Sequence, residues 1–317
     1  MRETVKPKVL KPGDCIGLVA PSRFVNDFRG DLEKGIKVLE NFGYKIAAGK
    51  HLYDRYYSSS AKAQDRADDI NSFIKDPNIK AIYSVLGGDS CNQILDSIDY
   101  NALKENPKVL LGFSDITHLL ISVNAKCNLV SLYAPGLKTL CHLTKESLAS
   151  LNGILINGDI GYPKKFDVYK NGKAGGCLIG GNLFVINNLL ATKYKPNLEG
   201  SLLFWEDVDD GLASVEFQLN QLKLSGALEG IGGMVIGEVV HEGEKTRDLK
   251  EIILELTGDY DFPIIKTNIF GHKTLDFYPI PIGVKAQIDT SGSESLKILE
   301  SVFIRFGFYS ASGIIVD

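Results

Sequence analysis

Long apolar runs are missing from this sequence of 317 residues. None approaches the roughly 18 residues that a membrane-spanning helix needs. The N-terminal stretch MRETVKPKVLKPGD is basic, but no apolar segment follows it, so we expect no secretory signal and a cytoplasmic protein. A basic excess is missing too, because 35 Lys and Arg stand against 39 Asp and Glu, a formal charge of −4. We therefore expect neither a membrane nor nucleic acid as a partner.

Cysteine is sparse and scattered, with five residues and no CxxC pair. An odd number without paired spacing argues against a disulfide framework and against structural zinc, so we predict no metal site. A cysteine nucleophile is also disfavoured, because Cys91 and Cys127 fall in or beside helical segments and have no obvious partner histidine. The other three are Cys15, Cys141 and Cys177.

Glycine, by contrast, is in excess, with 32 of 317 residues, where roughly 7% is usual. The length predicts two domains, at roughly 150 residues each. In the first half, short apolar runs alternate with segments of helical spacing, a pattern typical of a parallel sheet with helices on both faces. The predicted strands are 15–20, 44–47, 79–86 and 109–113, and the predicted helices are 31–42, 61–74, 91–98 and 115–125.

The composition changes in the middle of the chain. Residues 145–170 include Gly153, Gly158, Gly161, Pro163 and several lysines, which favours an interdomain linker. We therefore predict an N-terminal α/β domain over 1–144 and a second, smaller α/β or β-rich domain over 171–317. In this second domain the apolar pattern predicts strands 201–206, 232–240 and 262–268, and a helix over 215–224.

The most informative motif is Gly112-Phe113-Ser114-Asp115-Ile116, where an apolar strand ends and a helix follows. A serine on such a turn stands above the sheet edge, and the next backbone N–H lies near the helix N-terminus, where it can stabilise an oxyanion. The elbow of α/β-hydrolases has glycine where Ile116 stands, so this is a different motif. A simple helix N-cap serine is the alternative interpretation of Ser114.

A second turn, Gly87-Gly88, follows the preceding predicted strand. Parallel strands bring their carboxyl ends to one edge, so the two turns are expected to face each other. Glycine lets a backbone N–H approach an oxyanion without obstruction by a side chain. A plain tight turn or a phosphate loop are the alternatives, although GGDSCN matches neither GxGxxG nor a Walker A loop.

A serine nucleophile needs a base, and the base needs an orienting acid. His118 lies one helical turn after Ser114 and points along the same helix, while His142 adjoins Cys141, so neither suits the geometry. His272 lies in a loop between a predicted strand and a proline-rich segment, which suits a fixed site loop. The candidate acid is Glu206, with Asp207 beside it, at the end of an apolar strand. The sequence alone leaves open which of the two carboxylates is used, or whether both are merely solvated.

The motifs together resemble the LD-carboxypeptidase and microcin C self-immunity family of serine peptidases. The resemblance runs nearly end to end, from Leu10-Lys11-Pro12-Gly13-Asp14 to Pro281-Ile282-Gly283. Each motif is modest alone, but six in order are specific. They are Ala20-Pro21-Ser22, Gly87-Gly88, Gly112-Phe113-Ser114-Asp115-Ile116-Thr117, Gly180-Gly181-Asn182-Leu183, Phe204-Trp205-Glu206-Asp207 and Gly271-His272.

This resemblance implies roles for the matching positions. Ser114 is the nucleophile, His272 the general base and Glu206 the orienting carboxylate, while the backbone N–H groups of Gly88 and Asp115 form the oxyanion hole. The implied fold is an N-terminal α/β sandwich with a parallel, Rossmann-like sheet, joined to a C-terminal β-rich domain, in a homodimer. The implied reaction passes through an acyl-enzyme and uses no metal or organic cofactor.

The resemblance leaves two substrates open. The leading hypothesis is hydrolysis of an L,D-amide in a muramoyl tetrapeptide with release of D-alanine. The alternative is cleavage of peptidyl or aminoacyl adenylates such as processed microcin C. The segments Leu86–Asn92 and Asp76–Ala81 are similar to the microcin branch, whereas Phe204–Asp207 and Glu216–Leu228 are similar to the carboxypeptidase branch. A third hypothesis, from another class, is a non-catalytic sensor that binds a small molecule between two lobes.

Overall fold

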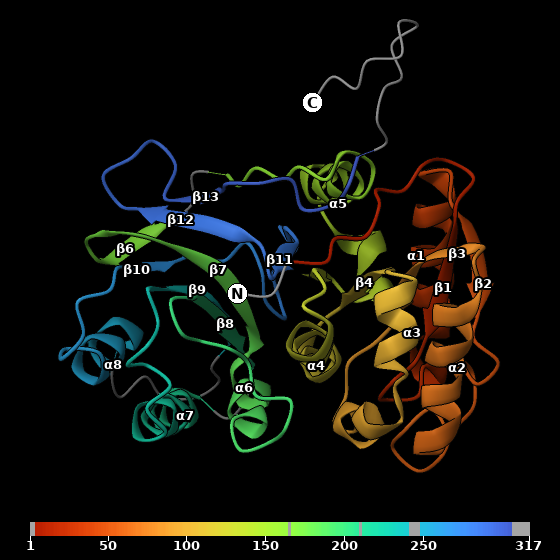
Figure 1. Cartoon of the computed structure of the whole chain (residues 1–317), viewed down its shortest axis with the longest axis horizontal. Coiled ribbons are helices and arrows are strands. Elements are labelled where there is room, and N and C mark those ends of the chain that lie inside the picture. Colours follow the sequence, from red (N-terminus) through yellow and green to blue (C-terminus); the bar gives the residue numbers. More distant parts are fainter. Residues whose placement is uncertain (1–3, 164–165, 209–210, 241–247, 306–317) are drawn as a thin grey trace, which may run out of the picture.

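The computed structural model describes residues 4–163, 166–208, 211–240 and 248–305, and its framework is two β-sheets with helices packed around each (Figure 1). Within these residues, no helix combines the length and apolar character that crossing a bilayer requires. The predicted fold class, a parallel α/β sheet followed by a β-rich half, is confirmed.

The first sheet has the strand order β11-β5-β4-β3-β1-β2. The first five strands of the chain are parallel in it, and β11 pairs antiparallel with β5 at one edge. Its strands are β1 (Cys15–Val19), β2 (Lys45–Ala48), β3 (Ile79–Ser84), β4 (Val109–Gly112), β5 (Ser131–Tyr133) and β11 (Ile280–Ile282).

Helices of the first half pack around this sheet in two groups, one formed by α1 with η4 and the other by α2, η2, α3 and α4. The predicted helix over 91–98 is a 3₁₀ helix, and the one over 115–125 begins as a 3₁₀ turn. The helices are η1 (Asn26–Phe28), α1 (Arg29–Asn41), α2 (Ala63–Lys75), η2 (Cys91–Ser97), α3 (Tyr100–Glu105), η3 (Ser114–Ile116), α4 (Thr117–Cys127) and η4 (Leu137–His142).

The second sheet has the order β13-β12-β7-β8-β9-β10-β6. Its central strands β7 to β10 are parallel, and the outer strands are antiparallel to their neighbours. The strands are β6 (Asp167–Lys170), β7 (Lys173–Asn182), β8 (Leu202–Asp207), β9 (Gly233–Val239), β10 (Ile264–Lys266), β12 (Lys285–Asp289) and β13 (Leu296–Ile298), and the helices of this half are α6 (Leu183–Leu189), α7 (Leu212–Leu224) and α8 (Leu249–Leu256).

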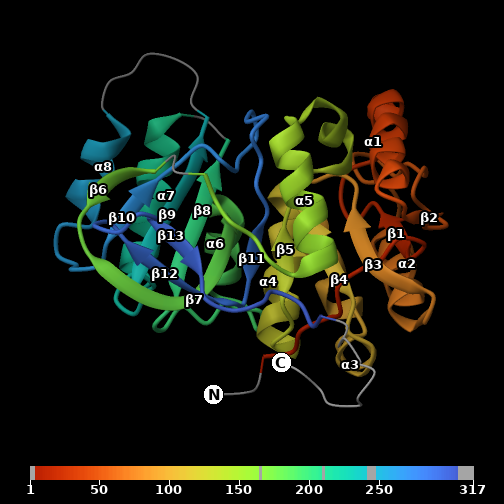
Figure 2. The ribbon, with the colours of Figure 1, turned by 90° about the horizontal axis from the view of Figure 1, so that it is seen from above.

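The described residues of the segment 145–170 form more regular structure than their composition suggests. It begins as helix α5 (Lys145–Asn157), which buries Leu151, Ile154 and Leu155, and it ends as β6 of the second sheet. The apolar spacing on α5 outweighs the single Gly153 inside it, since a glycine in a helix costs only about 1 kcal/mol relative to alanine. The second half of the chain also contributes to the first sheet. Strand β11, which lies within the proposed 171–317 domain, pairs at the edge of the sheet formed by residues of the proposed 1–144 domain (Figure 2).

The carboxyl ends of the parallel strands place the polar residues of interest. Strands β4 and β5 end at Gly112 and Tyr133, and β7 and β8 end at Asn182 and Asp207. Because parallel strands share one carboxyl edge, each sheet presents its motif residues together. One continuous cluster of buried apolar side chains runs through both halves of the described chain and fixes these edges relative to each other.

Candidate active site

Ser114 stands on a strained turn directly after β4. Its φ is +58°, in the left-handed region that costs free energy for a residue with a side chain. Ser114 does not cap the following helix, so the N-cap interpretation is wrong. Instead, the Thr117 hydroxyl donates to the Ser114 carbonyl oxygen over 2.6 Å and closes the turn. The strained turn leaves the Ser114 hydroxyl facing the second half of the chain.

A hydrogen-bonded series joins Ser114, His272 and Glu206. Ser114 Oγ lies 2.9 Å from His272 Nε2, and His272 Nδ1 lies 2.6 Å from Glu206 Oε2. Because Nδ1 faces a carboxylate, it carries the ring hydrogen, and Nε2 is left to accept the hydrogen of the serine hydroxyl. The three residues come from the ends of β4 and β8 and from the loop after β10, so the structure brings together all three predicted side chains.

Glu206 rather than Asp207 faces the imidazole. The Glu206 side chain is fully buried, and its Oε1 accepts hydrogen bonds from Tyr133 Oη over 2.6 Å and from Asn182 Nδ2 over 3.2 Å. With His272, the carboxylate therefore has three donors, which is how a buried charge is made tolerable. Asp207 turns to the other side of β8, where its Oδ2 accepts from Gln218 Nε2.

Tyr133 links the nucleophile turn to the acid, and the sequence pattern did not point to it. Its hydroxyl donates to Glu206 and accepts the backbone N–H of Ser114 over 3.2 Å. Burial, together with the neighbouring Glu206, raises the pKa of Tyr133 well above its usual value, so the phenol stays a neutral donor. Tyr133 lies in the three-residue strand Ser131–Tyr133, and only the pairing of β5 with β4 shows that it reaches the site.

The Gly87-Gly88 turn lies against the serine, as predicted. A Cβ on Gly87 would come within 2.9 Å of Ser114 Cβ, and one on Gly88, where φ is +148°, would meet Arg23 N at 2.8 Å. Gly88, Ser114 and Asp115 line the same cavity of about 500 Å³. Glycine is therefore required at both positions, and the backbone of this turn borders the space in which a substrate carbonyl would lie.

The Asp115 carboxylate holds the two turns together. Its Oδ2 accepts from Ser22 Oγ over 2.6 Å and from the backbone N–H groups of Ser90 and Cys91 over 3.0 and 2.9 Å. Its Oδ1 accepts from His118 Nδ1 over 2.8 Å. The aspartate that follows the serine thus connects the ends of β1, β3 and β4, which explains why Ala20-Pro21-Ser22 belongs with the other motifs.

Arg66 of α2 donates hydrogen bonds to the same two turns, and no motif in the sequence points to it. The buried guanidinium donates to the Pro21 carbonyl, to Ser90 O over 3.0 Å and to Gln93 Oε1 over 2.7 Å. Burial lowers the pKa of Arg66, although an arginine remains charged. In the sequence it follows Gln64 and Asp65 on a predicted helix, where a solvent-exposed position is the default expectation for an arginine.

The loop that carries His272 is fixed by Glu238, at the end of β9. Glu238 Oε2 accepts from the backbone N–H groups of Lys273 and Thr274 over 2.6 and 3.0 Å. Gly271, with φ at +150°, packs so closely that a Cβ would lie 2.3 Å from Glu238 Cβ. The ring of Phe113 lies 4.4 Å, centroid to centroid, from the imidazole. Glu238 therefore restrains the backbone of the loop, and Phe113 packs against the imidazole itself.

Among the described residues, no other histidine or cysteine joins the Ser114–His272–Glu206 series. His51 Nδ1 lies 2.7 Å from Asp54 Oδ2, His118 bonds Asp115, and His142 lies 3.6 Å from Asp31. His241 lies outside the described residues. Burial raises the pKa of the Cys91 thiol, and it raises that of Cys127 to about 11, so both thiols stay protonated and a cysteine nucleophile is disfavoured. Among the described residues, Asp31, Cys141 and His142 could together hold a metal ion, since their ligand atoms lie within 4.8 Å of one another. None of these three lines the Ser114 cavity.

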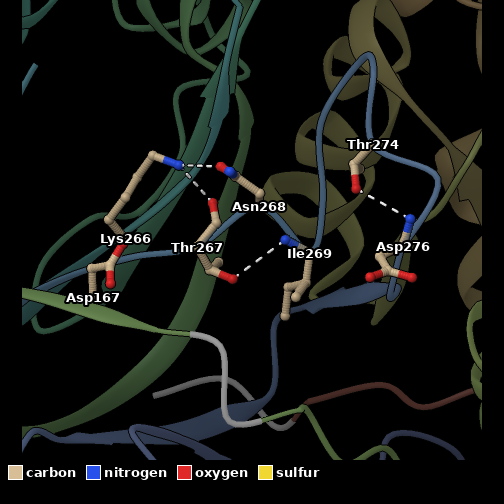
Figure 3. Close-up of a pocket in the computed structure, with 7 residues that line it drawn as sticks. All are labelled: Asp167, Lys266, Thr267, Asn268, Ile269, Thr274 and Asp276. Atoms are coloured by element: carbon tan, nitrogen blue, oxygen red, sulfur yellow. Dashed lines mark hydrogen bonds between the residues drawn. The ribbon is translucent and has the colours of Figure 1, made fainter.

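A second cavity, of about 350 Å³, lies beside the stem of the His272 loop (Figure 3). The Lys266 ammonium borders it and donates to Thr267 O over 2.8 Å and to the side-chain oxygen of Asn268. Across the cavity, Thr274 Oγ1 accepts the backbone N–H of Asp276 over 3.2 Å. Burial lowers the pKa of Lys266 to about 8, against a weaker opposite influence of Glu238 and Asp167.

Replacing Lys266 by methionine should change the pH dependence of stability. Below about pH 8 the folded protein holds a buried ammonium, whose cost relative to the unfolded chain is up to about 3 kcal/mol for a shift from 10.5 to about 8. That cost disappears as the pH rises from 8 to 10.5, because the folded protein has then released the proton while the unfolded chain keeps it until about pH 10.5. The free energy of unfolding of the wild type should therefore rise relative to Lys266→Met across this window, as measured by urea denaturation. Lys266→Arg, which stays charged, should show no such rise, and parallel curves for wild type and Lys266→Met would contradict the assignment.

Comparison with known proteins places these motifs in context. The profile described as the LD-carboxypeptidase N-terminal domain matches residues 16–134, and the one described as the LD-carboxypeptidase C-terminal domain matches residues 175–288. The chain is 28% identical over 309 residues to a Bacillus subtilis protein named "Probable murein peptide carboxypeptidase", covering 93% of this chain and 94% of that one.

A relative with a different name has the same sequence identity to this chain. The microcin C7 self-immunity protein MccF of Escherichia coli is 28% identical over 319 residues, covering 88% of this chain and 92% of that protein. A solved structure of MccF in complex with aspartyl sulfamoyl adenosine superposes with a TM-score of 0.85 at 25% identity, covering 95% of this chain and 100% of that one. The two-sheet architecture of this chain is thus similar to that of the solved MccF structure.

Proposed function

Because the chain belongs to the LD-carboxypeptidase family, we propose that it is a serine-type carboxypeptidase that hydrolyses the L,D-amide bond of a murein tetrapeptide and releases D-alanine in murein recycling. The observation that carries this proposal is the series Ser114 Oγ–His272–Glu206, with distances of 2.9 and 2.6 Å. A serine activated by an oriented histidine is the arrangement that acyl transfer needs.

The proposed reaction has two halves. As Ser114 Oγ attacks the scissile carbonyl carbon, His272 Nε2 takes the hydroxyl proton, and Glu206 stabilises the imidazolium. The backbone N–H groups of Gly88 and Asp115 stabilise the oxyanion, and both residues border the same cavity as Ser114. His272 then gives its proton to the leaving nitrogen, the C–N bond breaks, and the C-terminal residue departs from the acyl-enzyme.

Water completes the cycle. His272 removes a proton from a water molecule that attacks the ester carbon, and it returns the proton to Ser114 Oγ as the shortened peptide leaves. Every proposed step uses side chains and backbone of this chain, a peptide and water, so the proposal includes no cofactor.

A second candidate function is cleavage of a peptidyl or aminoacyl adenylate. One observation favours it: Phe184, which is 52% exposed, lines the Ser114 cavity and offers a ring face on which an adenine could stack. Trp205, which adjoins Glu206 in the sequence, is fully buried and is not such a face.

The experiment that tests the function assays both substrates side by side. We expect two values of kcat/KM to differ for the purified protein. The value for D-alanine release from a muramoyl tetrapeptide should be higher than the value for cleavage of an aminoacyl adenylate such as processed microcin C. Toxin cleavage without tetrapeptide cleavage would favour the second candidate. A serine-reactive phosphonate should label Ser114, whereas a sensor that only binds its ligand gives no reason for an activated serine.

We also propose that the protein acts as a homodimer in the cytoplasm. All five cysteines are free thiols, as a reducing compartment favours. Phe217 and Leu224 are seven residues apart in α7 and therefore lie on the same face of this helix. Their exposed fractions are 72% and 75%, and a second copy of the chain could cover them. Sedimentation equilibrium should give twice the chain mass of 34.7 kDa. A monomeric mass at micromolar concentration would contradict the dimer.

A further inference from the structure

One buried polar atom beside the Ser114 cavity has no role in the steps proposed above. His118 lies on α4, one turn after Ser114, and its residue surface is 4% exposed. Its Nδ1 lies 2.8 Å from Asp115 Oδ1 and 3.1 Å from the Asp115 carbonyl oxygen. Its Nε2 is buried and has no hydrogen-bond partner among the described residues. Because almost all buried polar atoms in folded proteins are paired, an unpaired one calls for an explanation.

The surroundings of this ring supply one. His118 lines the Ser114 cavity of about 500 Å³ and also an adjoining cavity of about 300 Å³. Asn92 and Asn188 line both cavities as well, so the two spaces meet at these three side chains. Helix α4, which carries His118, packs directly against α6, which contains Asn188 (Figure 1). His118 therefore lies where a substrate that extends beyond the scissile bond would pass.

The hydrogen on the ring decides what His118 can bind. A hydrogen on Nδ1 is held by the Asp115 carboxylate, which already accepts three other donors. The neutral ring then presents a lone pair at Nε2, which accepts a hydrogen bond but cannot donate one. A peptide offers the matching group, a backbone N–H or an ammonium.

The farther cavity carries charges of both signs. Lys193 and Asp96 form an ion pair of 2.9 Å there, and the Tyr194 hydroxyl donates to the same carboxylate. These groups border the 300 Å³ cavity together with His118, so a substrate arm that enters it meets polar and charged neighbours rather than an apolar surface.

We propose that His118 is a substrate-binding residue, whose Nε2 accepts a hydrogen bond from an N–H group of a polar peptide substrate at the junction of the two cavities. The proposal rests on the proposed peptidase function and adds to it a specificity-determining side chain outside the Ser114–His272–Glu206 series. In this arrangement the N–H group of the substrate is the hydrogen-bond partner of Nε2.

The test separates the two nitrogens of the ring. His118→Asn keeps an N–H for Asp115 at the position of Nδ1 and removes Nε2. His118→Gln reaches the position of Nε2 with an amide oxygen. With a tetrapeptide as substrate, KM should rise roughly tenfold in His118→Asn with a small change in kcat, because one hydrogen bond made equally in the ground and transition states is lost. His118→Gln should recover most of the affinity.

The controls distinguish binding from structure. His142→Asn, at a 51% exposed side chain, should leave KM unchanged. The rate at which a small phosphonate labels Ser114 should be equal in wild type and His118→Asn, since it reports the nucleophile and not the distant contact. Slower labelling that accompanies the rise in KM would show that His118 acts by positioning Asp115 and would overturn the proposal, as would an unchanged KM. A wild type that cleaves neither tetrapeptide nor adenylate would instead contradict the proposed function itself.

Discussion

Ser114→Ala is expected to reduce D-alanine release from a muramoyl tetrapeptide by roughly a million-fold in kcat, to the level that binding and the oxyanion donors sustain without a nucleophile. Alanine removes the hydroxyl that lies 2.9 Å from His272 Nε2 and leaves the backbone of the turn in place. No acyl-enzyme can then form, so no burst of product should precede the steady state. The measurement is the time course of D-alanine release with substrate in excess over enzyme, followed from the first turnover into the steady state.

The control for this prediction is a serine elsewhere on the surface. Ser72→Ala, at an exposed position near the end of α2, should keep the wild-type rate. Thermal unfolding of Ser114→Ala should show that the variant is folded. A folded variant that releases D-alanine within tenfold of the wild type would rule out Ser114 as the nucleophile.

Glu206→Gln should lower kcat by roughly ten-thousand-fold, because the tautomer of His272 is set by this carboxylate. Glu206 accepts three hydrogen bonds, from His272, Tyr133 and Asn182. A glutamine offers one oxygen and an NH₂ group in their place, so at least one of these donors meets another donor. If the NH₂ group faces Nδ1, the ring hydrogen moves to Nε2 and the imidazole can no longer accept the proton of Ser114.

Asp207→Asn is the matched control, since it makes the same chemical change one residue along the same strand. Its carboxylate contacts Gln218 and not His272, so kcat should fall far less. Steady-state kinetics across pH 6–9, with circular dichroism to verify folding, compare the two variants. Equal losses in both would contradict the assignment of Glu206 as the orienting acid.

The sequence could predict the three aligned side chains because each follows an apolar run in a recognisable motif. Ser114 and Glu206 end strands, and His272 stands in a short loop after one. What it could not provide was the choice between Glu206 and Asp207, because adjacent residues of a strand point to opposite faces and the strand ends irregularly here.

The roles of Tyr133 and Arg66 in the site could not be predicted from the sequence, for a different reason. Each acts through partners far away in the sequence, such as Glu206, 73 residues from Tyr133, and Ser90, 24 residues from Arg66. No local pattern encodes such contacts. Similarly, the proline-rich segment around Pro281 was not predicted as a strand, yet it forms β11, which tolerates proline because it is an edge strand.

The late position of His272 and strand β11 in the sequence determines when, during translation, the site and the first sheet can be completed. Ser114 lacks its base until the chain has been made as far as His272, and the first sheet lacks its outer strand until Ile282 has been made. A nascent or truncated chain that ends before His272 carries the serine without this imidazole and leaves β5 as an open sheet edge. Hydrolytic capacity therefore arises only after the second half of the chain has been translated as far as His272, 158 residues after the nucleophile.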